Sequence, residues 1–408
     1  MNMQDVIKRE LTNIDYFYLC SEIHQQVINT NGRLDQFYLY GENLDRFIFR
    51  FRTKEGKKDL VFNPPEFLFI RQSEQVEMQT QTSPFVSILK SKFSNYILKG
   101  VEQLQNDRII RLRFENGSIV LEGMRDFNIL ILDENENIIN SYKKDERITI
   151  GEKYSPPKST KQEISKENIL QAMKEDEKIV VAITRKIALP AFYVNEVLAS
   201  EGIDSKARTT GINDEMKKSI AERLEEFHMN LKKHLELSLE KAKQEKETEK
   251  EQNKETEKEE KKTERIVMPI LIEGRYIISD KRMIEKIKER KENNESKIAV
   301  LNSLSEIQEG IYRQKEMQEI EKEKGKRMNK LTERLRHQEE REKELIQEIN
   351  QEQEKGNWIM QNADLVNEII KRYKEIKIRG NKEELEKFLK ENNLEMTKNG
   401  IKMKIEKK

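Results

Sequence analysis

The stretch Arg46–Phe51 (Arg-Phe-Ile-Phe-Arg-Phe) indicates the fold class of the first third of the chain. Its charged and apolar residues partly alternate, as expected for a strand with one buried and one solvated face. Further strand-like runs are Phe37–Tyr40, Leu60–Phe62, Arg108–Phe114, Ser118–Glu122 and Asn128–Leu132, separated by turns rich in Gly, Asn and Pro. Pro84–Phe93 instead carries its apolar residues at helical spacing. Residues 1–157 are therefore predicted to form an α+β domain.

The composition of the whole chain limits what it can be. Of its 408 residues, 38 % are charged and 35 % are hydrophobic, which is too few apolar residues for a single globule. Helical rods or disorder must then account for much of the length. The 77 basic and 76 acidic residues leave a net charge of +1, so no bulk positive field would drive indiscriminate binding to nucleic acid. Any contact with RNA has to come from a local patch.

Motifs for catalysis, metal binding and membrane insertion are missing from the sequence. It has no Gly-rich phosphate loop, dinucleotide fingerprint or nucleophile elbow, and its four histidines are scattered. The single Cys20 excludes a disulfide framework and a structural zinc site. No apolar run approaches the length of a membrane span, and the N-terminus lacks a secretory signal. We expect a soluble cytoplasmic protein without catalytic residues, metal or cofactor.

The next two segments differ from the first in composition. Residues 158–237 follow a Pro-Pro linker and contain short helical patterns that end at Gly202 and Gly211. They are predicted to form a helix-hairpin-helix-like helical domain, whose turn amides can hold a nucleic-acid phosphate, or a plain helical bundle. Residues 238–265 are almost entirely charged or polar and fit a charged linker, which is either a solvated helix or disordered.

The last third of the chain is dominated by long helical patterns. After a strand-like run at Val267–Ile272, the segment Lys281–Glu354 is predicted to be helical, with apolar residues at heptad steps. A break is expected at Gly356–Asn357, and a second helix with one apolar face is expected at Ala363–Ile376. Two helices joined by a short break favour an antiparallel pair, so residues 266–380 are predicted to form a long antiparallel coiled-coil arm.

The segment Gln103–Ile110 (Gln-Leu-Gln-Asn-Asp-Arg-Ile-Ile) is the main candidate for a functional site. It places Asp107 and Arg108 where an apolar strand begins. One carboxylate acceptor beside one planar guanidinium fork suits the edges and phosphates of nucleotides. A local salt bridge that closes a turn would explain the same dipeptide, and the dipeptide alone does not separate these interpretations.

An ordered set of motifs resembles the NFACT family, which includes bacterial RqcH and eukaryotic NEMF. The matching segments are Ser83–Lys90, Ile97–Ile109, Glu122–Leu132, Gly151–Pro157, Ala188–Asp204, Arg334–Gln338 and Lys355–Val366. The resemblance implies a mixed α/β NFACT-N domain at residues 1–157, similar in fold to that of the Fpg-type DNA glycosylases. It also implies the family's helix-hairpin-helix module at residues 158–237 and its coiled coil after that.

The resemblance implies a function in ribosome-associated quality control and the rescue of stalled ribosomes. Family members bind a large ribosomal subunit that still carries peptidyl-tRNA and hold tRNA there. They promote mRNA-independent addition of residues, commonly alanine, to the stalled chain. Because the ribosome performs peptide transfer, the protein would be a binding and positioning factor and not a classical enzyme. Its partners would be the large subunit, with its rRNA and ribosomal proteins, and tRNA; no membrane and no DNA are expected.

The resemblance also suggests which residues engage RNA. The residues at family positions implicated in tRNA binding are Asp15, Asp107 and Arg108. Arg125 and Asn128 are expected either to brace a strand against a turn or to support a phosphate contact. Lys90 replaces the arginine of the family's Leu-Arg-Lys and would make a weaker basic contact.

The sequence departs from the family at its end, and two other classes of function compete. Residues 381–408 would lead into the family's RNA-binding NFACT-R domain, which is absent, so we expect that domain to be lost or supplied by a separate protein in trans. An Fpg-type DNA glycosylase would need an N-terminal proline, whereas this chain begins Met1-Asn2. A coiled-coil scaffold would bind protein partners and no tRNA.

Overall fold

The structure is a computed structural model. It describes residues 9–41, 45–74, 83–251, 265–272, 274–291, 298–398 and 400–403, and for residues 239–251 it describes the backbone only. The chain divides into two compact units, Met1–Gln318 and Glu319–Lys408. Of the predicted charged linker, residues 252–264 lie outside the described residues.

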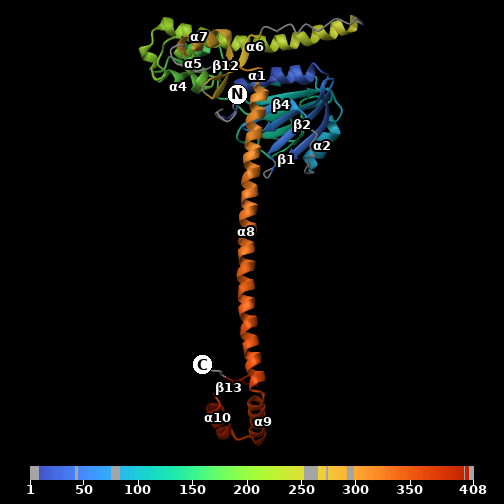
Figure 1. The fold of residues 1–408 in the computed structure, drawn as a ribbon. Coiled ribbons are helices and arrows are strands. Elements are labelled where there is room, and N and C mark those ends of the chain that lie inside the picture. Colours follow the sequence, from blue (N-terminus) through green and yellow to red (C-terminus); the bar gives the residue numbers. More distant parts are fainter. Residues whose placement is uncertain are drawn as a thin grey trace. The chain divides into compact units, whose positions relative to one another are not determined.

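Two antiparallel sheets form most of the N-terminal domain (Figure 1). The strands of the first are β1 (Arg33–Tyr40), β2 (Arg46–Thr53), β3 (Gly56–Asn63) and β4 (Phe67–Gln72), in that order. Those of the second are β5 (Gly100–Gln103), β6 (Ile109–Phe114), β7 (Gly117–Glu122), β8 (Asn128–Leu132) and β9 (Ile138–Ser141), also in chain order. The strand at Arg46–Phe51 is confirmed within β2, and the helix at Pro84–Phe93 is confirmed as α2.

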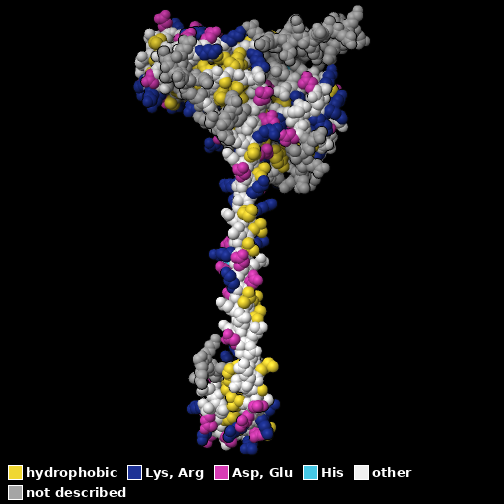
Figure 2. Space-filling view, viewed as in Figure 1, with side chains coloured by type: hydrophobic (Ala, Val, Ile, Leu, Met, Phe, Trp, Pro, Cys, Tyr) yellow, Lys and Arg dark blue, Asp and Glu magenta, His cyan; other side chains and the backbone are white. Residues whose placement is uncertain are grey.

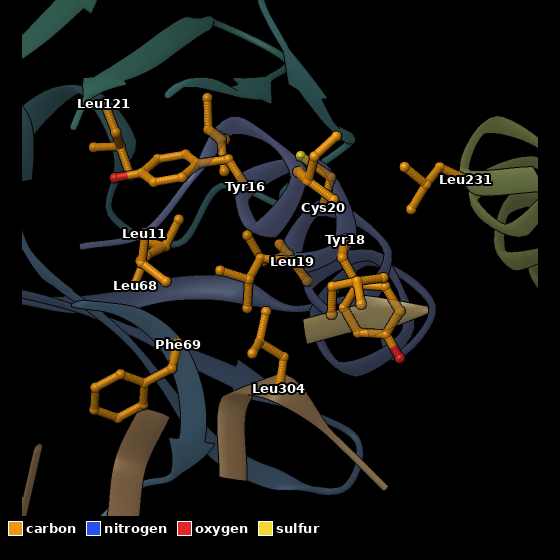
Figure 3. Packing of buried hydrophobic residues seen from close by; sticks show 14 of the residues in the cluster. Leu11, Tyr16, Tyr18, Leu19, Cys20, Leu68, Phe69, Leu121, Leu231 and Leu304 are labelled. Carbon is orange, nitrogen blue, oxygen red and sulfur yellow. The ribbon is translucent and has the colours of Figure 1, made fainter. Parts of the chain in front are cut away.

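A single buried helix, α1 (Asn13–Ile23), lies between these sheets and the rest of the first unit. Thr12 caps its N-terminus, and a π-helical turn (His24–Ile28) continues it. Figure 3 shows its side chains pointing in several directions: Tyr16 toward Leu121 of β7, and Leu19 between Leu68 of β4 and Leu304. A helix that is buried on all faces belongs to the core. The helix α1 is therefore the element on which the sheets and helices of the first unit converge.

A group of helices follows the second sheet. They are α3 (Lys166–Ala172), α4 (Ile179–Lys186), α5 (Ala191–Ser200), a 3₁₀ turn (Thr209–Gly211) and α6 (Asp214–Glu251). The structure thus has short helices where the helix-hairpin-helix-like domain was predicted, and that name remains a prediction. The helix α6 continues through residues 238–251, so this part of the predicted charged linker is helical.

The prediction of one helical region over Lys281–Glu354 was wrong. Its first part is instead the helix α7 (Lys281–Lys291), followed by the short strand β12 (Ile298–Val300). With β10 (Val267–Ile272) and β11 (Arg275–Asp280), β12 makes a three-stranded sheet that belongs to the first unit. The heptad pattern did not reveal this change because Lys- and Glu-rich segments favour helix whether or not they pair.

The long helix α8 (Leu304–Gln361) runs through Gly356 and Asn357, so the predicted break there was also wrong. An isolated Gly in a helix lowers its stability by only about 1 kcal/mol, which the rest of a long helix tolerates. The first turns of α8 are buried in the first unit. Beyond them its apolar side chains are exposed, as the yellow side chains along this helix show (Figure 2). In the described part of the chain no second helix covers this stripe, so coiled-coil pairing remains a prediction.

The described residues from 363 to 403 form a small module. The helices α9 (Ala363–Arg379) and α10 (Lys382–Glu391) pack with a hairpin of β13 (Leu394–Thr397) and β14 (Gly400–Met403). Their common core includes Ile376, Phe388 and Leu394. The described part of the predicted C-terminal segment 381–408 is thus folded into α10 and the β13–β14 hairpin.

Two histidines at the interface between α6 and α1 make stability depend on pH. His228 packs beside Phe17, and His234 stacks on Tyr18 with 5.4 Å between ring centroids. Burial lowers the pKa of both imidazoles to about 4, with smaller contributions from Lys232 and Arg265. The fold therefore favours neutral imidazoles, and their contribution is present above the unfolded-state pKa of about 6.5 and is lost as pH falls toward 4.

We predict that His228→Phe reduces the loss of stability on acidification. Between pH 7.5 and 5.5 a histidine with these pKa values lowers the free energy of unfolding by about 1 kcal/mol. The difference between the free energies of unfolding at pH 7.5 and pH 5.5, measured by denaturant unfolding, should be smaller by that amount in the variant. His337→Phe, on the exposed part of α8, is the matched control and should retain the wild-type difference. An unchanged pH dependence in His228→Phe would contradict the assignment.

Candidate nucleic-acid interface

The predicted site lies on the β5–β6 hairpin. The Leu104 amide donates to the Ile109 carbonyl at 2.9 Å, and the Asp107 amide donates to the Leu104 carbonyl at 3.1 Å. The two central residues of this turn, Gln105 and Asn106, have φ of 52° and 50°. Turns with two positive φ values suit hairpins but are normally made with Asn-Gly or similar pairs. A glutamine in this backbone conformation is unusual and directs attention to the tip of the hairpin.

Asp107 and Arg108 do not form the local salt bridge that the dipeptide allowed. The Asp107 Oδ1 atom accepts a hydrogen bond from the Arg108 backbone amide at 2.8 Å. The Arg108 guanidinium instead turns to Glu10, with 3.5 Å between Nη1 and Oε2. Both side chains are partly exposed, so each retains atoms that a ligand can reach.

Glu10 also brings Arg125 to the same surface. The Arg125 Nη2 atom lies 3.6 Å from Glu10 Oε1, and the Arg125 side chain is 84 % exposed. Exposed ion pairs of this length contribute about 0–1 kcal/mol, so a phosphate can replace the carboxylate at little cost. The surface formed by Glu10, Asp107, Arg108 and Arg125 therefore carries two positive and two negative charges.

Asp15 lies elsewhere, inside the protein. Its side chain is fully buried, and Arg9 binds it with two hydrogen bonds of 2.6 and 2.8 Å. Its Oδ2 atom also accepts from the amide and the hydroxyl of Thr12, at 2.6 and 2.7 Å. The Asp15 amide donates to Thr12 Oγ1 at 3.3 Å, and this bond and the one from the Thr12 amide form a capping box at the start of α1. Asp15 has no exposed atom to offer an RNA.

Hydrogen bonds connect the start of α1 to the hairpin. The Gln103 Nε2 atom donates to the carbonyls of Asn13 and Asp107, both at 2.7 Å. The Asn13 Nδ2 atom donates to the Asn106 carbonyl at 3.0 Å and to the Ala188 carbonyl at 2.7 Å. The capping box at Asp15 therefore fixes the residues that hold Asp107 in place.

Close packing behind the hairpin requires a glycine at position 123. The Gly123 amide donates to the Arg108 carbonyl at 2.8 Å. A Cβ on Gly123 would lie 1.7 Å from the hydroxyl oxygen of Tyr16. That hydroxyl is buried without a hydrogen-bond partner in the described part of the chain, and burial raises its pKa while the nearby Arg108 lowers it.

The remaining predicted residues lie apart from the hairpin tip. Asn128 is buried, and its Oδ1 and Nδ2 atoms bond the Lys143 amide and carbonyl at 2.8 and 3.0 Å, so it braces β8 against the loop that follows β9. Lys90 is half-buried in the last turn of α2, which packs on β1 and β9. None of the described contacts joins Asn128 or Lys90 to Asp107.

Three residues of this region were not anticipated: Arg9, Glu10 and Gly123. The capping box was readable, because Thr12-x-x-Asp15 precedes an apolar run and so predicts a helix start. Nothing in the local sequence shows that Arg9 would pair with Asp15.

Among the described residues, no group of three or more His, Cys, Asp or Glu side chains has the arrangement of a metal site. None of the helices within those ranges is long and apolar enough to cross a membrane.

Comparison with known proteins identifies the family. The sequence model of the family described as NFACT N-terminal and middle domains matches residues 13–408. The chain therefore belongs to the NFACT family. It is 26 % identical over 234 residues to the archaeal Rqc2 homolog aRqcH of Methanocaldococcus jannaschii, covering 52 % of this chain and 34 % of that protein. It is 25 % identical over 135 residues to ribosome quality control complex subunit 2 of Saccharomyces cerevisiae, covering 33 % of this chain and 13 % of that protein. The chain thus aligns with about a third or less of the length of these relatives.

Solved structures show more distant similarity. One is the N-terminal part of the fibronectin/fibrinogen-binding protein of Streptococcus suis, with 17 % identity, a TM-score of 0.42, and coverage of 52 % of this chain and 84 % of that chain. Another is the fibrinogen-binding protein of Staphylococcus aureus, with 13 % identity, a TM-score of 0.45, and coverage of 72 % and 97 %.

We predict that Asp15→Asn and Asp107→Asn differ sharply in stability. Asp15→Asn removes the charge that pairs with the Arg9 guanidinium and weakens a buried hydrogen-bond network, and because the Arg9 side chain is 21 % exposed, the free energy of unfolding should fall by about 2 kcal/mol. Asp107→Asn keeps an oxygen that can accept from the Arg108 amide, so its effect should stay within about 0.5 kcal/mol. Denaturant unfolding of the two variants measures the difference. Equal losses of unfolding free energy in the two variants would contradict the view that Asp15 is a buried structural carboxylate and Asp107 an exposed one.

Proposed function

We propose that the chain acts in ribosome-associated quality control. It binds obstructed large ribosomal subunits that carry peptidyl-tRNA and holds tRNA through the surface at the β5–β6 hairpin. The support is membership of the NFACT family, together with relatives whose names place them in that process. The observation that carries the proposal is the gathering of Asp107, Arg108 and Arg125 on one surface beside Glu10.

The chemistry of this surface suits an unpaired RNA loop. The Arg108 guanidinium can bond a phosphate with two parallel hydrogen bonds or stack on a base. Arg125 adds a second, more exposed guanidinium for the backbone. The second carboxylate oxygen of Asp107 is left to accept from an amino group at a base edge. Within the proposal Asp15 acts by positioning, because its side chain is buried.

Further steps are proposed downstream of tRNA binding. Peptide transfer would be performed by the ribosome, so the chain would orient tRNA and would not itself act as an enzyme. Alanine-type tailing of the stalled chain is part of the proposed activity, and an NFACT-R-type protein is a proposed partner in trans. A coiled-coil scaffold without tRNA binding is the second candidate, and the exposed apolar stripe of α8 is the observation that favours it.

We predict that purified protein binds tRNA in a salt-sensitive manner and that Asp107→Ala with Arg108→Ala weakens binding tenfold or more. Loss of charge-assisted hydrogen bonds to a phosphate and a base edge accounts for a change of about 1.4 kcal/mol or more. Filter binding at several salt concentrations measures it. Asp35→Ala with Lys57→Ala removes a paired carboxylate and cation from the first sheet and is the charge-matched control.

Sedimentation with separated large ribosomal subunits tests the same proposal in its biological setting. The wild type should travel with subunits that carry peptidyl-tRNA. Wild-type protein that binds neither tRNA nor large subunits would overturn the proposal in favour of the scaffold. A double variant that binds tRNA as well as the Asp35/Lys57 control does would remove the assignment to Asp107 and Arg108.

A further inference from the structure

A pocket lies directly beside the hairpin tip. One wall is made by Gln105 and Asn106, and the other by the linker segment 158–163, which leads from the second sheet to α3. The pocket has a volume of about 390 Å³, within the range of roughly 300–1,000 Å³ found for small-ligand sites. We call it the linker pocket. None of its residues was among the predicted site residues.

Both walls of the linker pocket are held by one chain of hydrogen bonds. The Asn13 side chain donates to the carbonyls of Asn106 and Ala188. The Ala188 amide in turn donates to the Gln162 carbonyl at 3.3 Å, and the Gln162 amide donates to the Lys186 carbonyl at 2.7 Å. The pocket is therefore built into the fold, and its walls do not depend on a ligand to bring them together.

The lining of the linker pocket fits a polar anion. Lys158 and Lys161 are exposed, and neither lysine forms an ion pair among the described residues. Glu163 is the one acidic residue of the lining, so the pocket keeps a net positive charge. Its other side chains are amides and the Ser159 hydroxyl, which accepts from the Lys161 amide at 3.2 Å. A lining of lysines and amides suits a phosphate together with the edge of a base.

The conformation of the hairpin tip supports the same ligand chemistry. Gln105 and Asn106 both have positive φ, which costs about 1–2 kcal/mol for a residue with a Cβ. Glycine at these positions would remove that cost. The tip thus keeps two amide side chains in the wall of the pocket at the expense of backbone stability, which is typical of residues held for binding.

We propose that the linker pocket binds one nucleotide of single-stranded RNA, next to the nucleotide held by Asp107 and Arg108. Lys158 and Lys161 bind its phosphate, and the amides of Gln105 and Asn106 bond its base. Gln105 and Arg108 belong to one hairpin tip, which the hydrogen bond from the Leu104 amide to the Ile109 carbonyl closes, so the linker pocket and the Arg108 guanidinium lie on the same hairpin. This inference rests on the proposed RNA-binding function and adds a second subsite to it.

Replacement of the two lysines tests the phosphate contact. Lys158→Gln with Lys161→Gln should weaken binding of a tRNA at least fivefold and reduce the slope of log affinity against log salt by about 1–2. Lys232→Gln with Lys233→Gln, on the exposed face of α6, removes the same charge outside the pocket and should leave both quantities near the wild type.

The outcomes separate this inference from the proposed function. Suppose that the wild type binds tRNA and that Asp107→Ala with Arg108→Ala weakens this binding. If Lys158→Gln with Lys161→Gln then binds tRNA as well as the α6 control variant does, the linker pocket is not a nucleotide subsite. If the wild type binds no tRNA, the proposed function fails and this inference fails with it.

Replacement of the hairpin tip tests the base contact without damaging the fold. Gln105→Asn with Asn106→Gly installs the pair that such turns favour, so thermal stability should stay equal or rise. Binding of tRNA should nevertheless fall by fivefold or more, because one amide is shortened and the other is removed. Wild-type affinity in this variant would overturn the role of the two amides.

Discussion

The ion pair between the partly buried Arg9 and the fully buried Asp15 is the interaction on which the first unit depends. The Arg9 guanidinium binds the Asp15 carboxylate, lies 4.2 Å over the Tyr276 ring of β11 and 5.0 Å from the Phe192 ring of α5. A single charge pair thus joins the start of α1, the helical domain and the three-stranded sheet. Removal of one partner of a buried pair leaves an uncompensated charge and typically costs about 3–5 kcal/mol. Apolar packing in the common core holds these elements together, and the ion pair fixes how the start of α1 meets the helical domain and the three-stranded sheet.

The other end of α1 holds the long helix in a comparable way. The buried Glu22 carboxylate accepts hydrogen bonds from the amides of Leu304 and Ser305, at 2.7 and 3.0 Å. Burial raises the pKa of Glu22, whereas these hydrogen bonds lower it. The amides belong to the first turn of α8, where backbone N–H groups lack partners within the helix. The helix α1 therefore carries an acidic residue at each end, and each one organises a different part of the first unit.

The elements with strong local patterns could be predicted from the sequence. The strand at Arg46–Phe51 and the helix at Pro84–Phe93 were readable because their periodicities differ clearly. The membership of the NFACT family was also readable, because its motifs occur in family order. The predicted break at Gly356 was wrong, because a single glycine breaks the apolar pattern of the sequence without ending the helix. The strand β12 was missed because its three residues lie between two charged segments.

The exposure of Asp107 and Arg108 could be anticipated from the sequence, and their binding role stays a prediction. Asp107 and Arg108 were found because they sit at a strand start, and the structure places both on an accessible surface. The burial of Asp15 was not predictable, because its partner Arg9 is basic and close in sequence but pairs through tertiary packing with two aromatic rings. The linker pocket was equally hidden, since its two walls are some fifty residues apart in the sequence and are joined through Asn13 and Ala188.

The proposed function has RNA contact the hairpin tip and gives Asp15 a positioning role. A cryo-EM structure of the chain bound to a large ribosomal subunit with tRNA is the most direct test of this division. We predict RNA within hydrogen-bonding distance of the Asp107 and Arg108 side chains, with the pair of Arg9 and Asp15 intact and buried. RNA bound on another face, or Asp15 released from Arg9 to bind a nucleotide, would contradict it.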